Sequence, residues 1–231
     1  MREGLSFRAT AVAVLAYAVA MAYVEAAVVV YLERALGADV GDVFPIRPIT
    51  EAGGLAAIET GREAATLVMI GAVGIIAGRS RLERLAWAAV VFGAWDIGYY
   101  AWLYVFSGWP PSPGTIDLLF LIPVPWAGPV WSPVAVSSLL VCVGLVAART
   151  LRAGRVFVVC PRHWIAAVAG GILIALSYMT DAPRVLDGGL PGPYPWPLFV
   201  AGVALALWAA VDVLRRGRGA AGPTPASSRP A

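Results

Sequence analysis

Residues 9–32, ATAVAVLAYAVAMAYVEAAVVVYL, decide the fold, because Glu25 is the only charged residue among them. A helix rises about 1.5 Å per residue, so about 20 apolar residues are enough to cross the hydrocarbon core of a bilayer. The apolar part of a secretory signal peptide is shorter, at about 7–15 residues. We therefore predict that this segment is a retained transmembrane helix.

Five further segments have this length and character, namely residues 58–78, 85–106, 130–148, 164–180 and 196–214. The 231-residue chain is 60% hydrophobic and 13% charged, whereas soluble domains are about 45–50% apolar and about 25% charged. A lipid bilayer must therefore be its solvent. The prediction is an all-α, polytopic transmembrane helical bundle of about six spans, formed by residues 1–216 as a single domain. Residues 217–231, rich in Pro, Ser, Gly and Ala, are predicted to be a disordered cytoplasmic tail.

Arginines are concentrated in alternate loops and at both ends of the chain: Arg2, Arg8, Arg79, Arg81, Arg84, Arg149, Arg152, Arg155, Arg162, Arg215, Arg216 and Arg218. The other loops contain only Arg34, Arg47 and Arg184. The positive-inside rule then places both termini in the cytoplasm. This placement also accounts for the net charge of +3 without a nucleic-acid partner. The absence of Lys and the bias to Ala, Gly and Val are typical of a GC-rich bacterial genome, so we expect a bacterial inner (plasma) membrane.

One connection is irregular. Residues 108–129, GWPPSPGTIDLLFLIPVPWAGP, contain six prolines around a short apolar run at 116–122. Because this run is too short to cross, it is expected either as a short interfacial helix on the outer side or as a re-entrant segment covered by protein. Nearby Trp109, Trp126 and Trp131 are typical of the aromatic belt at the headgroups.

Charged residues inside the spans indicate where function lies. A charge at the bilayer centre is unfavourable by about 2.5–3.5 kcal/mol on insertion scales, so such residues are often paired and functional. The candidates for a substrate or ion site in the outer half of the bundle are Glu25, Glu59, Arg62, Glu63, Asp96, Tyr99 and Tyr100. Helical spacing puts Glu59 and Glu63 on one face, with Arg62 beside Glu59. A purely structural role is the alternative for each, as a helix-end ion pair or as a link between helices.

Hard oxygen ligands suit Mg, Ca, Mn or iron, so a metal ion is one candidate ligand, held by Glu25, Glu59, Glu63 and Asp96. The single His163 excludes a haem with two axial histidines from one chain, and no other cofactor is indicated. Cys142 lies in a span and Cys160 in a loop on the predicted cytoplasmic side, so no disulfide is expected.

Several other polar residues carry weaker signals. Asp212 precedes Arg215 and Arg216 at a helix end, which predicts a solvated ion pair. His163 is expected at the membrane interface, and Asp117 and Asp181 lie at loop edges, where they could cap helices or line an entrance. Glycines at 74, 78, 170 and 171 are expected to allow close approach of helices.

Three strings, REAATLVMI, FGAWDIGYY and DLLFLIPVPWAGPVW, together resemble an uncharacterised family of bacterial multi-pass membrane proteins. The resemblance covers about residues 19–134. It implies a multi-pass membrane fold and brings no assigned activity, so it transfers no functional residue.

Three functions are left open by the sequence. The first is a proton- or cation-linked carrier, against which the apolar inner halves of the first three spans count. The second is a membrane enzyme or redox protein with a carboxylate-bound metal, or a metal-free variant in which Arg62 binds an anionic headgroup. The third is an accessory subunit, in which a partner chain completes the buried charges. A homo-oligomer is compatible with each of them.

Overall fold

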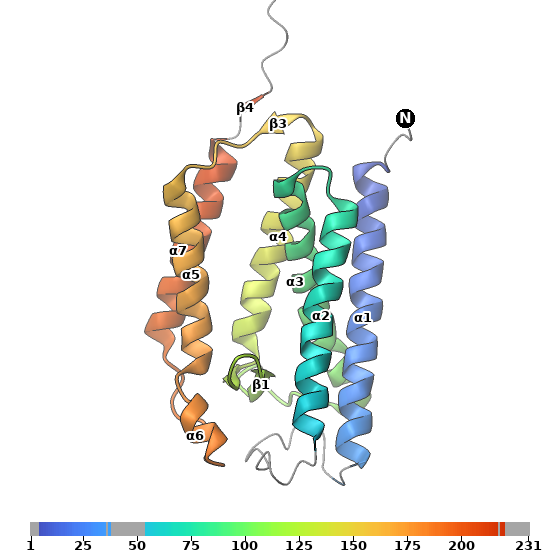
Figure 1. Cartoon of the computed structure of the whole chain (residues 1–231), viewed down its shortest axis with the longest axis vertical. Helices are drawn as coiled ribbons and strands as arrows, with labels where there is room; N and C mark the ends of the chain where they lie inside the picture. Colours follow the sequence, from blue (N-terminus) through green and yellow to red (C-terminus); the bar gives the residue numbers. More distant parts are fainter. Residues whose placement is uncertain (1–4, 36, 38–53, 217, 220–231) are drawn as a thin grey trace, which may run out of the picture.

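The structure, a computed structural model, describes residues 5–35, 37, 54–216 and 218–219. Six of its helices are long and apolar enough to cross a membrane, which confirms the predicted all-α polytopic bundle. The spanning helices are α1 (Phe7–Ala35), α2 (Leu55–Ala77), α3 (Arg81–Ser107), α4 (Trp131–Arg152), α5 (Pro161–Met179) and α7 (Trp196–Arg215). Each contains most of one predicted span. They run side by side along the long axis of the molecule (Figure 1).

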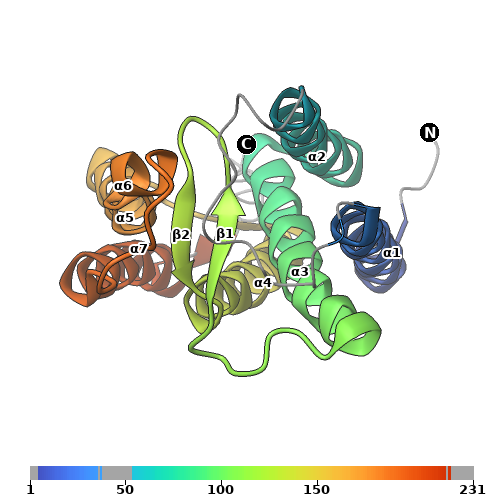
Figure 2. The ribbon, with the colours of Figure 1, turned by 90° about the horizontal axis from the view of Figure 1, so that it is seen from below.

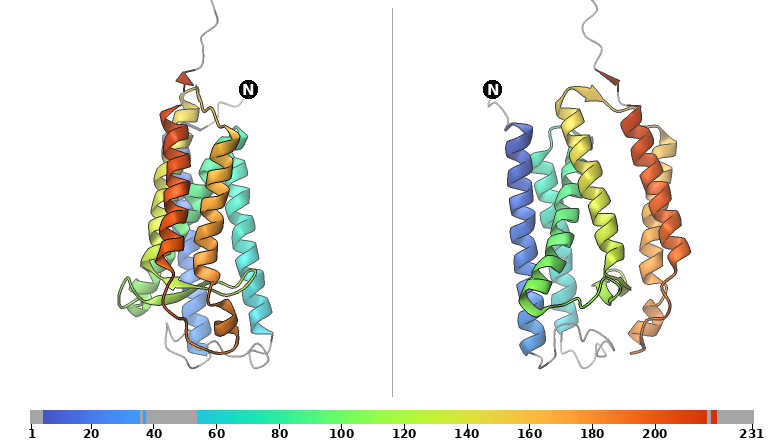
Figure 3. Two further views of the ribbon diagram at one scale, coloured as in Figure 1. Left: turned by 90° about the vertical axis from the view of Figure 1, so that its left-hand side faces the viewer. Right: turned by 180° about the vertical axis from the view of Figure 1, so that it is seen from behind.

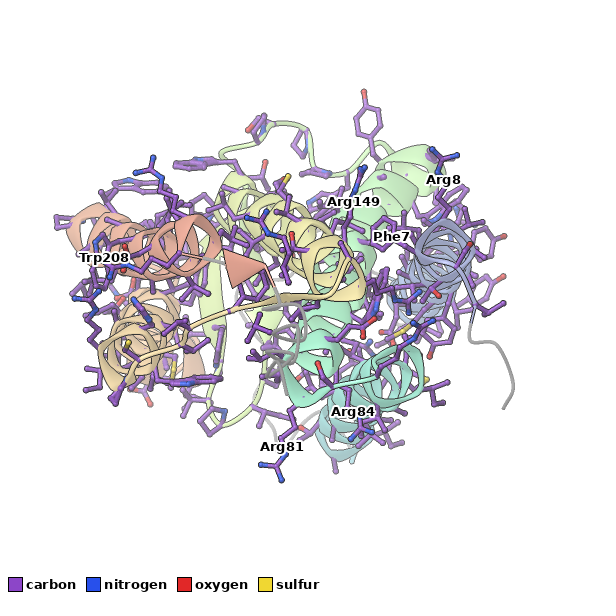
Figure 4. The ribbon with its side chains drawn as sticks, turned by 90° about the horizontal axis from the view of Figure 1, so that it is seen from above. Phe7, Arg8, Arg81, Arg84, Arg149 and Trp208 are labelled. Atoms are coloured by element: carbon purple, nitrogen blue, oxygen red, sulfur yellow. The ribbon has the colours of Figure 1, made fainter. Side chains whose placement is uncertain are left out.

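The start of α1 and the end of α7 lie at the same end of the bundle (Figure 1). Arg8, Arg81, Arg84 and Arg149 lie at this end, as Figure 4 shows from above, and we call it the arginine end. The opposite end carries the strands β1 (Ile116–Phe120) and β2 (Trp126–Pro129) and the short helix α6 (Ala182–Leu186). We call it the hairpin end. The helix ends and the described loops thus alternate between the two ends of the bundle, as predicted.

Helix α3 is the centre of the larger part of the bundle. It packs against α1, α2 and α4, whereas α1 and α2 hardly contact each other. Trp87, Val90 and Val91 of α3 are fully buried among apolar side chains of α1 and α2. Helices α5 and α7 form a separate pair, which contacts the rest mainly through β2 and α4. Figure 2 shows this pair on the far side of the two strands from α1 and α2.

The Pro-rich connection forms a β-hairpin. Strands β1 and β2 are antiparallel, with Ile116 paired to Pro129 and Leu118 to Ala127. The expectation of a short helix at 116–122 is therefore wrong. The hairpin crosses the bundle between α3 and the α5–α7 pair (Figure 3). Along the long axis it lies nearer the middle of the bundle than α6 does. The prolines stop helix formation here, because proline lacks the N–H that an α-helix needs.

The arginine end is held by a buried ion pair that the sequence analysis missed. Arg152 donates from Nε to Glu83 Oε1 over 2.6 Å, and Glu83 also accepts from the Trp87 indole over 3.1 Å. The other guanidinium nitrogens of Arg152 donate to Thr10 Oγ1 and to the carbonyls of Leu5 and Ala77. One side chain thus connects α4 with α1, with α2 and α3, and with the chain just before α1.

One weaker prediction at the arginine end, the placement of His163, needs correction. His163 is 2% exposed and caps the start of α5, where its Nδ1 accepts from the Cys160 N–H over 3.0 Å. Its Nε2 therefore carries the proton that is donated to Asp212 over 2.8 Å, so His163 joins α5 to α7 and does not simply lie at the interface. Asp212 pairs with Arg216, as expected, and also with Arg162 of α5.

The other predictions concern the two cysteines and the C-terminal tail. Cys142 and Cys160 are both free, as expected. The tail prediction falls mostly on residues outside the described ranges, but the pair 218–219 forms a strand, β4 (Arg218–Gly219), against β3 (Arg155–Val156).

Gly170 and Gly171 offer a matched test of close helix packing. A Cβ on Gly170 would lie 2.7 Å from the Gly202 carbonyl oxygen of α7, whereas a Cβ on Gly171 would meet nothing within 4 Å. Overpacking is unfavourable by about 1–3 kcal/mol, and alanine is favoured over glycine in a helix by about 1 kcal/mol. We expect Gly170→Ala to lower the midpoint of thermal unfolding and Gly171→Ala to leave it unchanged or raise it. Equal midpoints in detergent would contradict the close contact of α5 and α7.

Candidate functional site

A cavity of about 220 Å³ lies between α1, α2, α3 and β1, in the half of the bundle nearer the hairpin end. All seven residues predicted for a substrate or ion site line it: Glu25, Glu59, Arg62, Glu63, Asp96, Tyr99 and Tyr100. Helices α1, α2 and α3 thus bring these seven side chains to the wall of one cavity. Glu33, Thr66, Trp95, Trp109 and Asp117 also line the cavity and were not among the predicted site residues.

Arg62 is the centre of the charge network on the α1–α2 side. It forms an ion pair with Glu25 of α1, and its Nε donates to Glu59 of α2 over 3.0 Å. Glu25 is 5% exposed and also accepts from the Thr66 hydroxyl over 2.6 Å. The sequence showed no partner for Glu25, because Arg62 lies on another helix. One guanidinium therefore neutralises at most one of the two carboxylates that share it.

Glu63 connects α2 to the hairpin. Both of its carboxylate oxygens accept from the backbone N–H of Leu121, over 3.0 and 2.9 Å. Leu121 immediately follows β1, and the backbone at an edge of a hairpin has N–H groups that need acceptors. Glu63 therefore holds the hairpin against α2 and closes one side of the cavity.

Two aspartates lie on the α3 side of the cavity. The Asp96 carboxylate is half-buried and accepts from the Ser137 hydroxyl of α4 over 2.8 Å. Asp117 of β1 is 4% exposed and accepts from the Tyr100 hydroxyl over 2.8 Å and from the Leu118 N–H over 2.8 Å. The Tyr100 hydroxyl thus pairs with Asp117 of β1 and not with Asp96, which lies one turn earlier on the same helix.

Asp117 titrates near neutrality. Burial raises the pKa of its carboxyl from 3.8 to about 7, and the negative charges of Asp96 and Glu33 add to this effect. The hydrogen bonds from Tyr100 and Leu118 favour the ionised form and oppose the rise. Asp117 can therefore release or take up a proton at physiological pH without any other change in the site.

Aromatic side chains form much of the remaining wall. Tyr99 and Tyr100 contact each other edge to face, with ring centroids 5.3 Å apart, and Trp109 contacts Tyr100 at 6.1 Å. Trp95 is 7% exposed, and its indole Nε1 has no hydrogen-bond partner within the described part of the chain. A buried N–H without a partner is unfavourable by about 1–3 kcal/mol, so a ligand that accepts from it gains this much.

The predicted metal ligands do not gather into a ligand set. Among the described residues, no three His, Cys, Asp or Glu side chains are arranged so that they could hold a metal ion. Glu25 is engaged by Arg62 and Thr66, Glu63 by the hairpin backbone and Asp96 by Ser137. The carboxylates are distributed around the cavity, which suits a ligand larger than a single metal ion.

No family model, curated protein or solved structure matches the chain.

A second cavity, of about 470 Å³, lies at the arginine end of the same α1–α2 seam. Its lining includes Thr10, Tyr17, Val73, Arg79 and Arg152. Tyr17 and Glu25 are the residues of α1 that bring the two cavities closest, and eight residues correspond to about 12 Å along a helix. Buried apolar side chains of α1, α2 and α3 fill the bundle between them, among them Ala18, Ile70 and Val91.

Asp117 was expected only to cap a helix or line an entrance, because it lies in a loop-like Pro-rich segment, where a carboxylate is normally solvated. The signal was present in the alternation of TIDLLF, since Asp117 and Leu119 of a strand share one face. Thr66 lies seven residues after Glu59, two helical turns further along α2, and this spacing could have identified it.

Proposed function

We propose that the chain is a carrier of a bacterial inner membrane that binds a small organic ammonium ion in the acidic cavity and exchanges it for protons. The observation that carries the proposal is the charge balance of the cavity. Glu25, Glu59, Glu63, Asp96 and Asp117 line it, and Arg62 is the only basic residue among the lining residues that the structure describes. Buried carboxylates without counter-charges are strongly unfavourable, so either protons or a bound cation must accompany them.

The aromatic wall favours an organic ammonium ion over a metal ion. Tyr and Trp faces attract cations, with a gain of about 0.5–2 kcal/mol that is largest when water is excluded. Tyr99, Tyr100 and Trp109 provide such faces, and the Trp95 N–H can donate to an oxygen of the ligand. The distributed carboxylates and the volume of about 220 Å³ fit a molecule of several heavy atoms.

The second cavity supports transport rather than binding alone. Both cavities lie along the α1–α2 seam, where the two helices hardly contact each other. A movement of α1 against α2 would need to break few direct contacts between them. The packed layer between the cavities then acts as the closed barrier of one state of an alternating-access cycle. The inner halves of the first three spans can therefore be apolar in this state, because the path to the cytoplasm opens only in the other state.

Orientation follows from the arginines. Positive-inside placement puts the arginine end in the cytoplasm, with both termini, and the hairpin end on the outer side. The acidic cavity would then receive its ligand from outside the cell. For Glu25 no partner chain is needed, since it pairs with Arg62 within the chain.

Choline binding tests the proposal directly. We expect purified protein in detergent to bind choline and to reject its neutral carbon isostere, 3,3-dimethylbutan-1-ol, in calorimetric titrations. Replacing Asp96 by Asn removes a cavity carboxylate and should weaken choline binding at least tenfold, or about 1.4 kcal/mol. Asp187→Asn is the matched control, because Asp187 is exposed at the hairpin end and does not line the cavity.

Two results would contradict the proposal. Equal affinities for choline and its neutral isostere would show that charge does not govern the cavity. Equal effects of Asp96→Asn and Asp187→Asn would show that binding occurs elsewhere. Uptake of labelled choline into proteoliposomes then separates a carrier from a binding protein, since only a carrier accumulates it against a proton gradient.

A further inference from the structure

A groove at the arginine end separates α3 and α4 from the α5–α7 pair. It has a volume of about 270 Å³, and its lining is almost entirely apolar. Figure 1 shows α4 between the α5–α7 pair and α3. The groove is distinct from both cavities of the α1–α2 seam, since it shares no lining residue with either.

Side-chain size explains why the groove exists. At the hairpin end, stacked aromatic rings separate the α5–α7 pair from α4 and β2. The ring centroids of Trp131 and Trp196 are 4.6 Å apart, and those of Trp126 and Tyr178 are 6.0 Å apart. Toward the arginine end both walls carry small residues, namely Ala86, Ala89 and Ala147 on one and Ala206, Ala209 and Ala210 on the other. Small residues normally let membrane helices approach closely. Here they face each other across a space.

An apolar space of this kind in a bilayer is filled by hydrocarbon. Water is disfavoured, because it needs two to four polar partners and the walls offer almost none. An empty groove would lose the dispersion contacts of its lining. On α4 the groove runs from Leu140 to Leu151, which is about 16 Å along the helix and matches half of a hydrocarbon core of about 30 Å. The length is that of one acyl chain of one leaflet.

The rim of the groove is positively charged. Arg81 and Arg215 are exposed, and each is adjacent in the sequence to a lining residue, Leu82 and Leu214 respectively. The nearby carboxylate of Asp212 is already shared by Arg162, Arg216 and His163. Trp164 lines the groove and is half exposed, as is typical of a side chain at the headgroup level.

From these features we propose that the groove holds an acyl chain of an anionic phospholipid from the leaflet at the arginine end, with the headgroup bound by Arg81 and its neighbours. The bound lipid joins the two parts of the bundle where few side chains do. It is a structural component at a site independent of cation binding.

Photo-cross-linking in nanodiscs tests the proposal on the wild-type protein. The probe is phosphatidylglycerol with a diazirine in one acyl chain. We expect the cross-linked peptides to cover residues 140–151 and 206–214 well above the lipid-facing surfaces of α1 and α2. Labelling at equal density on all lipid-facing surfaces, or labelling that spares the groove, would overturn the proposal.

Two pairs of variants sharpen the test. Ala210→Phe fills the groove and should lower cross-linking roughly tenfold, whereas Leu207→Phe, on the exposed face of the same helix, should not. Arg81→Gln should lower the preference for phosphatidylglycerol over phosphatidylcholine about fivefold, since one arginine near an anionic surface contributes about 1 kcal/mol. Arg149→Gln removes an exposed arginine on another side of the same end and should not change it. Unchanged labelling in Ala210→Phe, or equal effects of the two arginine variants, would overturn the proposal.

Discussion

Replacing Arg152 by methionine should destabilise the protein by about 3–5 kcal/mol, the largest stability effect we expect from a single substitution. The loss has this size because the change leaves Glu83 buried without its counter-charge. Glu83 is 2% exposed, and the remaining donors, the Arg79 N–H and the Trp87 indole, are both uncharged. Thr10 Oγ1 and the Ala77 carbonyl lose a donor at the same time. Unfolding in mixed detergent micelles measures the change.

Two comparisons make this result specific. Arg149→Gln lies one turn earlier on α4, removes an exposed charge and should change stability by less than about 0.5 kcal/mol. Adding Glu83→Gln to Arg152→Met removes the unpaired buried charge and should restore more than half of the loss. If Arg152→Met and Arg149→Gln are equally stable, the buried ion pair does not hold the arginine end.

Choline affinity should rise roughly fiftyfold between pH 5 and pH 7 and level off above pH 8. The direction follows from Asp117, whose pKa is about 7 because of burial. A bound cation favours the ionised carboxylate, so binding must release the proton that Asp117 holds below its pKa. About 1% of this carboxyl is ionised at pH 5 and about half at pH 7, which sets the size of the effect. Titrations in buffers of different ionisation enthalpy count the protons released.

Asp117→Asn supplies the control for the pH dependence. Asparagine keeps an oxygen acceptor for the Tyr100 hydroxyl and cannot titrate. We expect weaker binding whose affinity changes less between pH 5 and pH 8 than that of the wild type. A pH dependence as steep as that of the wild type would assign the released proton to another carboxyl of the cavity.

The six spans could be predicted because hydropathy and length are local properties of the sequence. Residues 9–32 and the five similar segments each satisfy the bilayer alone, so no tertiary contact is needed to identify them. The site residues on α1, α2 and α3 were found for a related reason. A charge within such a segment is conspicuous, and Glu25 and Asp96 have no neighbouring charge of opposite sign that would explain them locally.

The partners of these residues could not be predicted, since they depend on how helices face each other. Glu25 and Arg62 lie on different helices, and Arg152 reaches Glu83 across 69 residues. Arginines near the ends of spans are also expected from topology alone, so the buried role of Arg152 had no signal of its own. The hairpin was missed because a seven-residue apolar run between prolines is ambiguous between strand and helix.

The order in which the contacts of Arg152 lie along the chain has a consequence for biosynthesis. Its partners Ala77, Thr10 and Leu5 precede it by 75, 142 and 147 residues. A nascent chain that has inserted only α1, α2 and α3 therefore carries Glu83 without its guanidinium. We therefore expect the first four helices to become linked only once the last turn of α4 has been synthesised, before α5 and α7 are complete.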